Sequence, residues 1–175
     1  MYEYETTPGH IVIAETDGHI TRISLAFDAS TLKDERSETR LIKEAHRQLR
    51  AYFDGKLFEF VLPLAPKGTE FMQSVWQALR EIPYGETASY KDIAVRIGNP
   101  KAVRAVGMAN NRNPIAIVIP CHRVIGSDGQ LVGYRSGLEN KRKLLDLEAK
   151  CSSRKPEMNL NDFNKAVDKL IEQSR

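Results

Sequence analysis

A chain of 175 residues that is 41% hydrophobic and 28% charged has a globular composition, which argues against disorder. It holds no run of about 18 apolar residues and no secretory leader, so we expect neither a membrane span nor a signal peptide. Two cysteines, Cys121 and Cys151, are too few for a disulfide framework, which favours a cytoplasmic protein, or a nuclear one in a eukaryote.

Charge is distributed unevenly along the chain. Residues 1–66 carry 8 Lys/Arg against 11 Asp/Glu, a net −3, whereas residues 67–150 carry 13 against 8, a net +5. No acidic residue occurs between Asp92 and Asp128. This window holds five basic residues: Arg96, Lys101, Arg104, Arg112 and Arg123. A polyanion is a natural partner for such a stretch, although a solvated helix face would also explain the charge.

The N-terminal third of the chain predicts strands followed by a helix. Residues 10–27 form two β-rich runs around Asp17-Gly18, a sequence typical of a hairpin turn. Residues 38–55 place apolar side chains on one helical face and end at Gly55, a common helix stop.

The chain is expected to divide shortly after this helix. Apolar side chains alternate over residues 57–64, which predicts a strand, and turn residues follow at 65–68. We therefore expect an N-terminal domain over residues 1–66 and a second domain over 67–150. The remaining residues, 151–175, form an extension whose apolar periodicity predicts a helix.

The second domain opens with a helix-turn-helix candidate. Residues 69–82 carry the apolar stripe of a helix. Ser89 with Asp92 three residues later is a capping signature for a short helix, which Gly98 would end. Pro100 suits the first turn of the next helix. Two short helices joined by a tight turn that contains glycine are typical of a helix-turn-helix.

The second of these helices is rich in small residues, among them Ala102, Ala105 and Gly107. Small side chains allow the helix backbone to approach a partner closely, either DNA or another helix. A packed core helix is the commoner meaning of such a composition. The acid-free window around Arg104 favours DNA.

A cysteine follows the longest apolar run. Residues 115–119 read as a buried strand, and Cys121 comes after Pro120, where the chain would leave the core. We expect His122 and Arg123 to line a cleft, because such side chains are rarely buried. A nearby histidine and positive charge favour the nucleophilic thiolate.

The Cys-His pair alone would also fit a cysteine protease or a pair of metal ligands. Four histidines and two cysteines lie scattered along the chain, without the paired spacing of a zinc site. We therefore expect no bound metal.

Three segments together carry a family resemblance: PCHRVIGSDGQLVGY, PYGETASYKDIA and AVRAVGMANNRNP. They are similar to those of the DNA O6-alkylguanine alkyltransferases, the methylated-DNA–protein-cysteine methyltransferases, over the region from Tyr52 to Glu148. The resemblance implies an α/β, RNase H-like N-terminal domain and a mainly α C-terminal winged helix-turn-helix domain. It also implies a monomer, without a cofactor, that binds double-stranded DNA mainly in the minor groove and flips an alkylated guanine into a pocket.

The resemblance implies a single, irreversible transfer of an alkyl group from O6 of guanine to Cys121. His122 would take the thiol proton through a water molecule, with Glu148 supporting the imidazolium. Tyr90 would help to rotate the nucleotide and would donate a proton to the leaving guanine. Asn113 would tie the recognition helix to the active-site turn. Whether O4 of thymine is a second target stays open.

The same resemblance implies residues for DNA binding and for the guanine pocket. Arg104 would fill the gap that the extruded base leaves in the duplex. The other positions implied at the DNA are Ala102, Ala105 and Ser89. The positions implied around the guanine are Pro120, Val124, Tyr134 and Arg135.

The chain departs from the family pattern at Ser136, where many bacterial members carry a tryptophan, so tolerance for bulky alkyl groups stays open. The N-terminal domain has no cysteine, so the structural zinc of some relatives is not expected. Two alternatives to repair remain. One is a damage-binding relative, although such proteins lack the reactive cysteine that is present here as Cys121. The other is an alkylation-sensing transcriptional regulator, which would bind one DNA sequence tightly.

Overall fold

The computed structural model describes residues 1–6, 9–26 and 38–154. The chain forms two compact units, Met1–Pro66 and Lys67–Ser153. Within the described ranges, no helix is long and apolar enough to span a membrane.

The first unit contains an antiparallel sheet of three strands in the order β1-β2-β3. These are β1 (Tyr2–Thr6), β2 (Gly9–Thr16) and β3 (His19–Ala26). Asp17 and Gly18 link β2 to β3 with positive φ angles of 50° and 72°, as a tight hairpin turn requires. The predicted hairpin is therefore confirmed, whereas β1 was not predicted.

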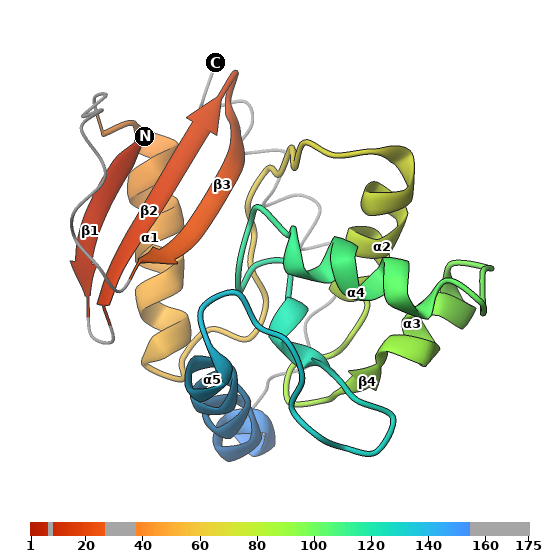
Figure 1. The fold of residues 1–175 in the computed structure, drawn as a ribbon. Coiled ribbons are helices and arrows are strands. Elements are labelled where there is room, and N and C mark those ends of the chain that lie inside the picture. The colour runs from red at the N-terminus through yellow and green to blue at the C-terminus, as the bar shows by residue number, and fades with distance from the viewer. Residues whose placement is uncertain (7–8, 27–37, 155–175) are drawn as a thin grey trace. The chain divides into compact units, whose positions relative to one another are not determined.

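Helix α1 (Arg40–Phe53) lies against one face of this sheet (Figure 1). Thr39 caps its start, because the side-chain oxygen accepts a hydrogen bond from the backbone N–H of Ile42 at 3.1 Å. Gly55, with φ of 67°, follows its end. The helix predicted over residues 38–55 is confirmed. It buries six side chains: Leu41, Ile42, Ala45, Gln48, Leu49 and Tyr52.

The strand predicted over residues 57–64 is wrong. Only an isolated parallel bridge to Ile20 forms, supported by a hydrogen bond from the Ile20 N–H to the Pro63 carbonyl at 2.8 Å. The side-chain amide of Gln48 pairs with both the N–H and the C=O of Val61, each at 2.8 Å. A helix side chain therefore occupies backbone groups that a neighbouring strand would need, and Pro63 has no N–H to donate.

In the second unit, α2 (Glu70–Arg80) is anchored by an aromatic side chain. Thr69 caps the helix. Trp76 is 2% exposed, and its indole N–H donates to the carbonyl of Ala109 at 2.9 Å. Gly68 leaves room for this ring, since a Cβ there would lie 2.5 Å from the indole.

The predicted helix-turn-helix is present as α3 (Tyr90–Arg96) and α4 (Val103–Asn111). The capping box forms as expected: the Ser89 hydroxyl accepts from the Asp92 N–H at 3.1 Å, and the Asp92 carboxylate accepts from the Ser89 N–H at 2.8 Å. Gly98, with φ of 73°, ends α3. Its N–H bonds back to Val95, which satisfies a terminal carbonyl of the helix.

Two local predictions in this unit are wrong. Pro100 does not lie in the first turn of α4, because a turn closed by the Ala102 N–H on the Asn99 carbonyl (3.0 Å) precedes the helix. Residues 115–119 do not form a strand. Ile117 has a φ of 72°, a value that reverses the chain and that a β-branched residue rarely adopts.

The rest of the second unit brings separate segments together. The short helix η1 (Cys121–Arg123) runs into β5 (Val124–Ile125), which pairs in parallel with β4 (Ala88–Ser89). Helix α5 (Leu138–Cys151) contacts η1 and continues into η2 (Ser152–Arg154). The helix predicted further along the extension falls outside the described residues.

Candidate active site

Cys121 lies at the start of a tight turn and is 6% exposed. Its N–H donates to the carbonyl of Ile119 at 2.8 Å, and its carbonyl accepts from the N–H of Val124. Pro120 and Val124, both predicted to line the guanine pocket, are buried on either side of this turn. The backbone around the thiol is therefore fixed by its neighbours.

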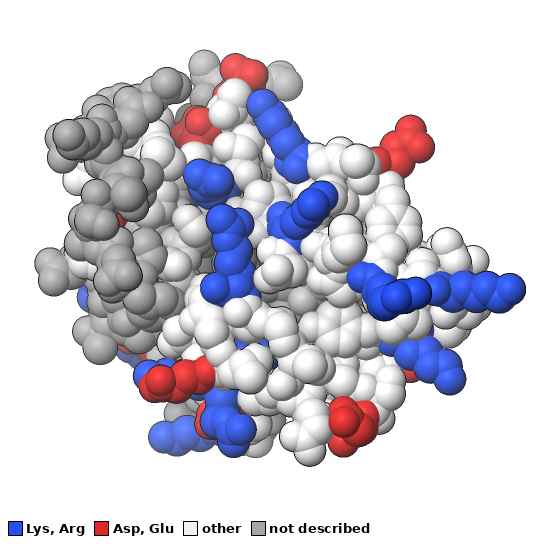
Figure 2. All heavy atoms as spheres, in the orientation of Figure 1, with Lys and Arg blue, Asp and Glu red and all other residues white. Residues whose placement is uncertain are grey.

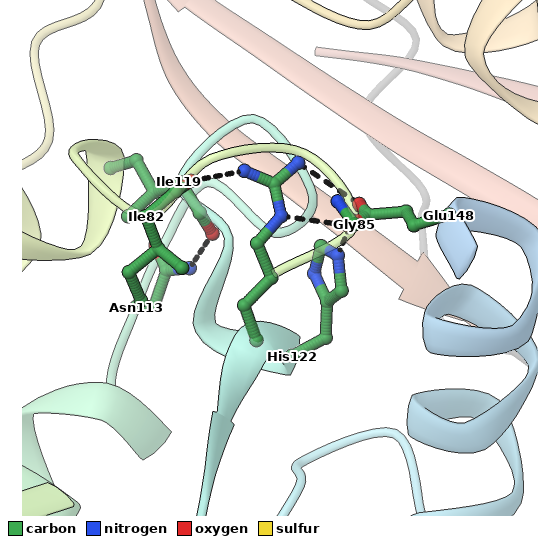
Figure 3. Close-up of polar contacts among 7 residues, drawn as sticks. Ile82, Gly85, Asn113, Ile119, His122 and Glu148 are labelled. Atoms are coloured by element: carbon green, nitrogen blue, oxygen red, sulfur yellow. Dashed lines mark hydrogen bonds and ion pairs between the residues drawn. The ribbon is translucent and has the colours of Figure 1, made fainter. Parts of the chain in front are cut away.

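His122 and Arg123 are buried, with 0% and 7% exposure, so the prediction that they line an open cleft is wrong. Their burial is possible because both side chains contact the carboxylate of Glu148 on α5, which is also fully buried. Arg123 donates to its two carboxylate oxygens at 2.8 and 2.9 Å and to the Ile82 carbonyl at 2.6 Å. The Nε2 atom of His122 lies 2.8 Å from the same carboxylate, and the Gly85 N–H donates to it at 3.0 Å (Figure 3).

These contacts set the protonation states. Burial alone would raise the pKa of Glu148, but hydrogen bonds and charge from His122 and Arg123 outweigh it and lower that pKa below its usual range. Burial lowers the pKa of His122, against the hydrogen bond to Glu148. Since Arg123 already neutralises the carboxylate, we infer a neutral imidazole at pH 7. A neutral imidazole can accept a proton.

The nucleophile itself rests as a thiol. Burial raises the pKa of Cys121, while a hydrogen bond from Asn113 and the charge of Lys141 oppose the rise. Asn113 is held in place because its amide donates to the Ile119 carbonyl at 2.7 Å and accepts from the Ile115 N–H at 3.0 Å. Asn113 lies two residues after the end of α4, so these bonds connect that end of the helix with the segment that precedes Cys121. A buried thiol of this kind needs a base to become a nucleophile.

Sequence reasoning missed Lys141, which is 0% exposed. Its ammonium donates to the carbonyls of Val124 (2.5 Å) and Val132 (2.8 Å) and lies 5.9 Å from the ring centre of Tyr90. Burial lowers its pKa to about 8. Within the described part of the chain it pairs with no carboxylate. The sequence does hold one indication that Lys141 belongs to the site. It lies seven residues before Glu148, and that spacing places both side chains on one face of a helix.

Two predicted aromatic residues lie near the thiol. The Tyr90 hydroxyl donates to the Val132 carbonyl at 3.1 Å. The Tyr134 hydroxyl is buried and has no hydrogen-bond partner among the described residues. Burial raises the pKa of both, and a charge on Cys121 adds to the rise. Arg135, predicted at the same pocket, is exposed and makes no hydrogen bond or ion pair within the described ranges.

The exposed face of the helix-turn-helix is basic. Figure 2 shows Lys and Arg side chains projecting from the surface over α3 and α4. Arg104 and Ala105 are exposed, and Ala102 and Ser89 are half-buried, with Ser89 engaged in capping α3. The other exposed basic residues on or next to α3 and α4 are Lys91, Arg96, Lys101 and Arg112. Arg123, from the same acid-free window, belongs to the buried site instead.

The first unit packs a helix on an antiparallel sheet, and the second combines a basic helix-turn-helix with a buried cysteine, histidine and glutamate. The features of the second unit are typical of a DNA-binding protein that holds a thiol beside a base. Residues 2–66 match the ribonuclease-like domain of 6-O-methylguanine DNA methyltransferases, and residues 70–150 match the DNA binding domain of the same proteins. The chain belongs to the 6-O-methylguanine DNA methyltransferase family, as the sequence motifs predicted.

Individual relatives agree. The methylated-DNA–protein-cysteine methyltransferase of Methanosarcina barkeri is 69% identical over 109 residues, which cover 62% of this chain and 69% of the relative. The constitutive enzyme of Bacillus subtilis is 49% identical over 151 residues, covering 82% and 92%. The structure of Mycobacterium tuberculosis OGT in complex with DNA matches with a TM-score of 0.77 and 44% identity, covering 85% of this chain and 92% of that one. Neither alternative to repair finds support in these relatives.

Proposed function

We propose that this protein repairs DNA directly, by moving an alkyl group from O6 of guanine onto the sulfur of Cys121. The observation that carries the proposal is the buried arrangement of Cys121, His122 and Glu148 in the domain that holds the basic helix-turn-helix. Cys121 precedes His122, whose Nε2 atom lies 2.8 Å from the Glu148 carboxylate, and burial favours the neutral forms of the thiol and the imidazole by shifting the pKa of each. Family membership supplies the reaction class, alkyl transfer to cysteine.

In this mechanism His122 accepts the proton of Cys121 through a water molecule. Glu148, kept ionised by Arg123, stabilises the imidazolium that results. The thiolate attacks the alkyl carbon: the S–C bond forms as the C–O6 bond breaks, and the electron pair of that bond goes to the guanine. Tyr90 keeps its proton at neutral pH because its pKa is raised, so it can protonate the leaving base.

The thioether product has no easy route back to a thiol. Each molecule therefore acts once, and the chemistry requires no cofactor.

For DNA recognition we propose that α4 enters the minor groove. Ala102 and Ala105 allow a close approach of its backbone, Ser89 lies near the phosphates, and Arg104 fills the space of the flipped base. The extruded guanine would sit beside the thiol. Its surroundings would be Pro120, Val124, Tyr134 and the backbone at Arg135. We propose a monomer that acts where the chromosome lies, which is the cytoplasm in cells like those of the archaeal and bacterial relatives.

Stoichiometry tests this proposal. The protein is mixed with an excess of duplex containing O6-methylguanine, and the methylated base that remains is counted after enzymatic digestion. The loss of O6-methylguanine from the duplex should stop once each protein molecule has removed one methyl group. The Cys121→Ser variant should remove none while still binding the duplex, and Cys151→Ser, the matched control, should behave as the unmodified protein. Loss that continues through many equivalents, or loss with Cys121→Ser, would contradict the mechanism.

A further inference from the structure

The last turn of α4 contains a buried amide to which neither the sequence motifs nor the proposed mechanism assigns a role. Asn110 is 2% exposed, whereas the next residue, Asn111, is exposed. The other buried side chains of this helix, Val106 and Ala109, are apolar. A polar residue in such a position needs a physical reason.

Stability does not supply that reason. The Nδ2 atom of Asn110 donates to the carbonyl of Cys121 at 3.4 Å, which is long for a hydrogen bond. Its Oδ1 atom is buried and has no partner within the described part of the chain. The amide cannot be reversed, because Oδ1 would then face a carbonyl that only accepts. A leucine of similar size would avoid the unsatisfied acceptor.

The location of the amide indicates what it does. Asn113, three residues further on, donates to the Ile119 carbonyl at 2.7 Å. The two asparagines thus hold the carbonyls on both sides of Pro120, and Asn110 holds the one that belongs to the nucleophile itself. The Cys121 carbonyl also accepts from the backbone that follows it, so a second donor restricts rotation of this peptide further.

We propose that Asn110 is a positioning residue that couples the DNA-binding helix to the nucleophile. This inference rests on the proposed alkyl transfer. Its hydrogen bond to the Cys121 carbonyl, 3.4 Å long, shortens when α4 is seated on DNA, as bonds at reacting centres often do when the complex forms. The shortened bond fixes the Cys121 peptide, and thereby the direction from which the sulfur meets the alkyl carbon.

A buried positioning residue of this kind affects the rate of alkyl transfer and leaves the affinity for DNA unchanged. Asn110 is not on the surface of α4, so its loss removes no contact with the duplex. Replacing it with leucine also removes the unsatisfied acceptor, so the folded state keeps or gains stability. A residue with a merely structural role would show the opposite pattern, with lower stability and an unchanged transfer rate.

The test compares Asn110→Leu with the unmodified protein and with Asn111→Leu, an exposed control on the same helix. We expect the transfer rate constant at saturating O6-methylguanine duplex to fall about tenfold in Asn110→Leu, roughly the loss of one hydrogen bond. Duplex affinity, measured in a Cys121→Ser background, should stay within about twofold, and Tm should not fall. An unchanged rate constant in Asn110→Leu would overturn the inference.

A second variant keeps the test decisive if Asn110→Leu does not fold. In Asn110→Asp, burial raises the pKa of the new carboxyl, whose protonated form can still donate to the Cys121 carbonyl. The transfer rate relative to the unmodified protein should therefore decline as pH rises, because the carboxylate repels both the carbonyl and the thiolate. A ratio of one at every pH would overturn the inference. If the unmodified protein transfers no methyl group, the proposed function fails instead.

Discussion

Replacing Arg123 with methionine removes the cation that shares the carboxylate of Glu148 while keeping most of the side-chain volume. Arg123 is 7% exposed and Glu148 is fully buried, so water cannot replace the two lost hydrogen bonds to Glu148, of 2.8 and 2.9 Å, or the one to the Ile82 carbonyl, of 2.6 Å. Removing one partner of a buried ion pair costs about 3–5 kcal/mol. We expect a loss of this size in the free energy of unfolding, measured by urea titration at pH 7.

The same change should alter catalysis. Without Arg123, the full charge of Glu148 acts on His122, which raises the pKa of the imidazole and leaves it protonated at rest. Methyl transfer should then be slow at pH 7 and recover as pH rises. Arg123→Lys, the control, keeps the positive charge but loses the two-bond geometry of the guanidinium on the carboxylate. Its rate of methyl transfer at pH 7 should lie between those of Arg123→Met and the unmodified protein.

A double variant distinguishes the cost of leaving Glu148 without its cation from other effects of the Arg123→Met substitution on stability. Adding Glu148→Gln to Arg123→Met removes the uncompensated charge, so part of the lost stability should return. A loss below about 1 kcal/mol in Arg123→Met would refute the reasoning. So would a double variant that is destabilised by the sum of the single changes.

Four further outcomes are expected. Because the pKa of Glu148 is lowered on folding, its contribution to stability is present above pH 4.5 and lost as pH falls, so Glu148→Gln should show a flatter decline in Tm in acid. Lys141→Met should slow methyl transfer at pH 7, and the difference should shrink above pH 8, where the ammonium of the unmodified protein loses its proton. Gly68→Ala should lower the free energy of unfolding by about 1–3 kcal/mol, since the new methyl group collides with Trp76. Arg104→Ala should weaken duplex binding at every sequence and reduce its salt dependence, as followed by fluorescence anisotropy.

Local signals predicted much of the fold. The capping box of Ser89 and Asp92 and the turn at Asp17-Gly18 act over three or four residues, so a single sequence displays them completely. The predicted strands at 57–64 and 115–119 failed because their outcome depends on distant groups or on unusual backbone. In the first, the amide of Gln48 bonds to backbone groups that a strand partner would need. In the second, the chain reverses at Ile117, within a continuous apolar run.

The site was harder to predict than the fold. The motif identified Cys121, His122 and Glu148, but the burial of His122 could not be read from the sequence, because it requires a carboxylate from α5 that is 26 residues away. Lys141 was missed for a related reason. In the sequence it stands among other charged residues of a helix that looks solvated, and only packing shows that its ammonium turns inward onto two carbonyls.

Mass spectrometry of the intact protein, after incubation with an oligonucleotide that contains O6-methylguanine, tests the central claim most directly. Alkyl transfer to Cys121 predicts a gain of one methylene, mapped by peptide analysis to that residue and absent in Cys121→Ser. A protein that binds the oligonucleotide but keeps its original mass would contradict the account.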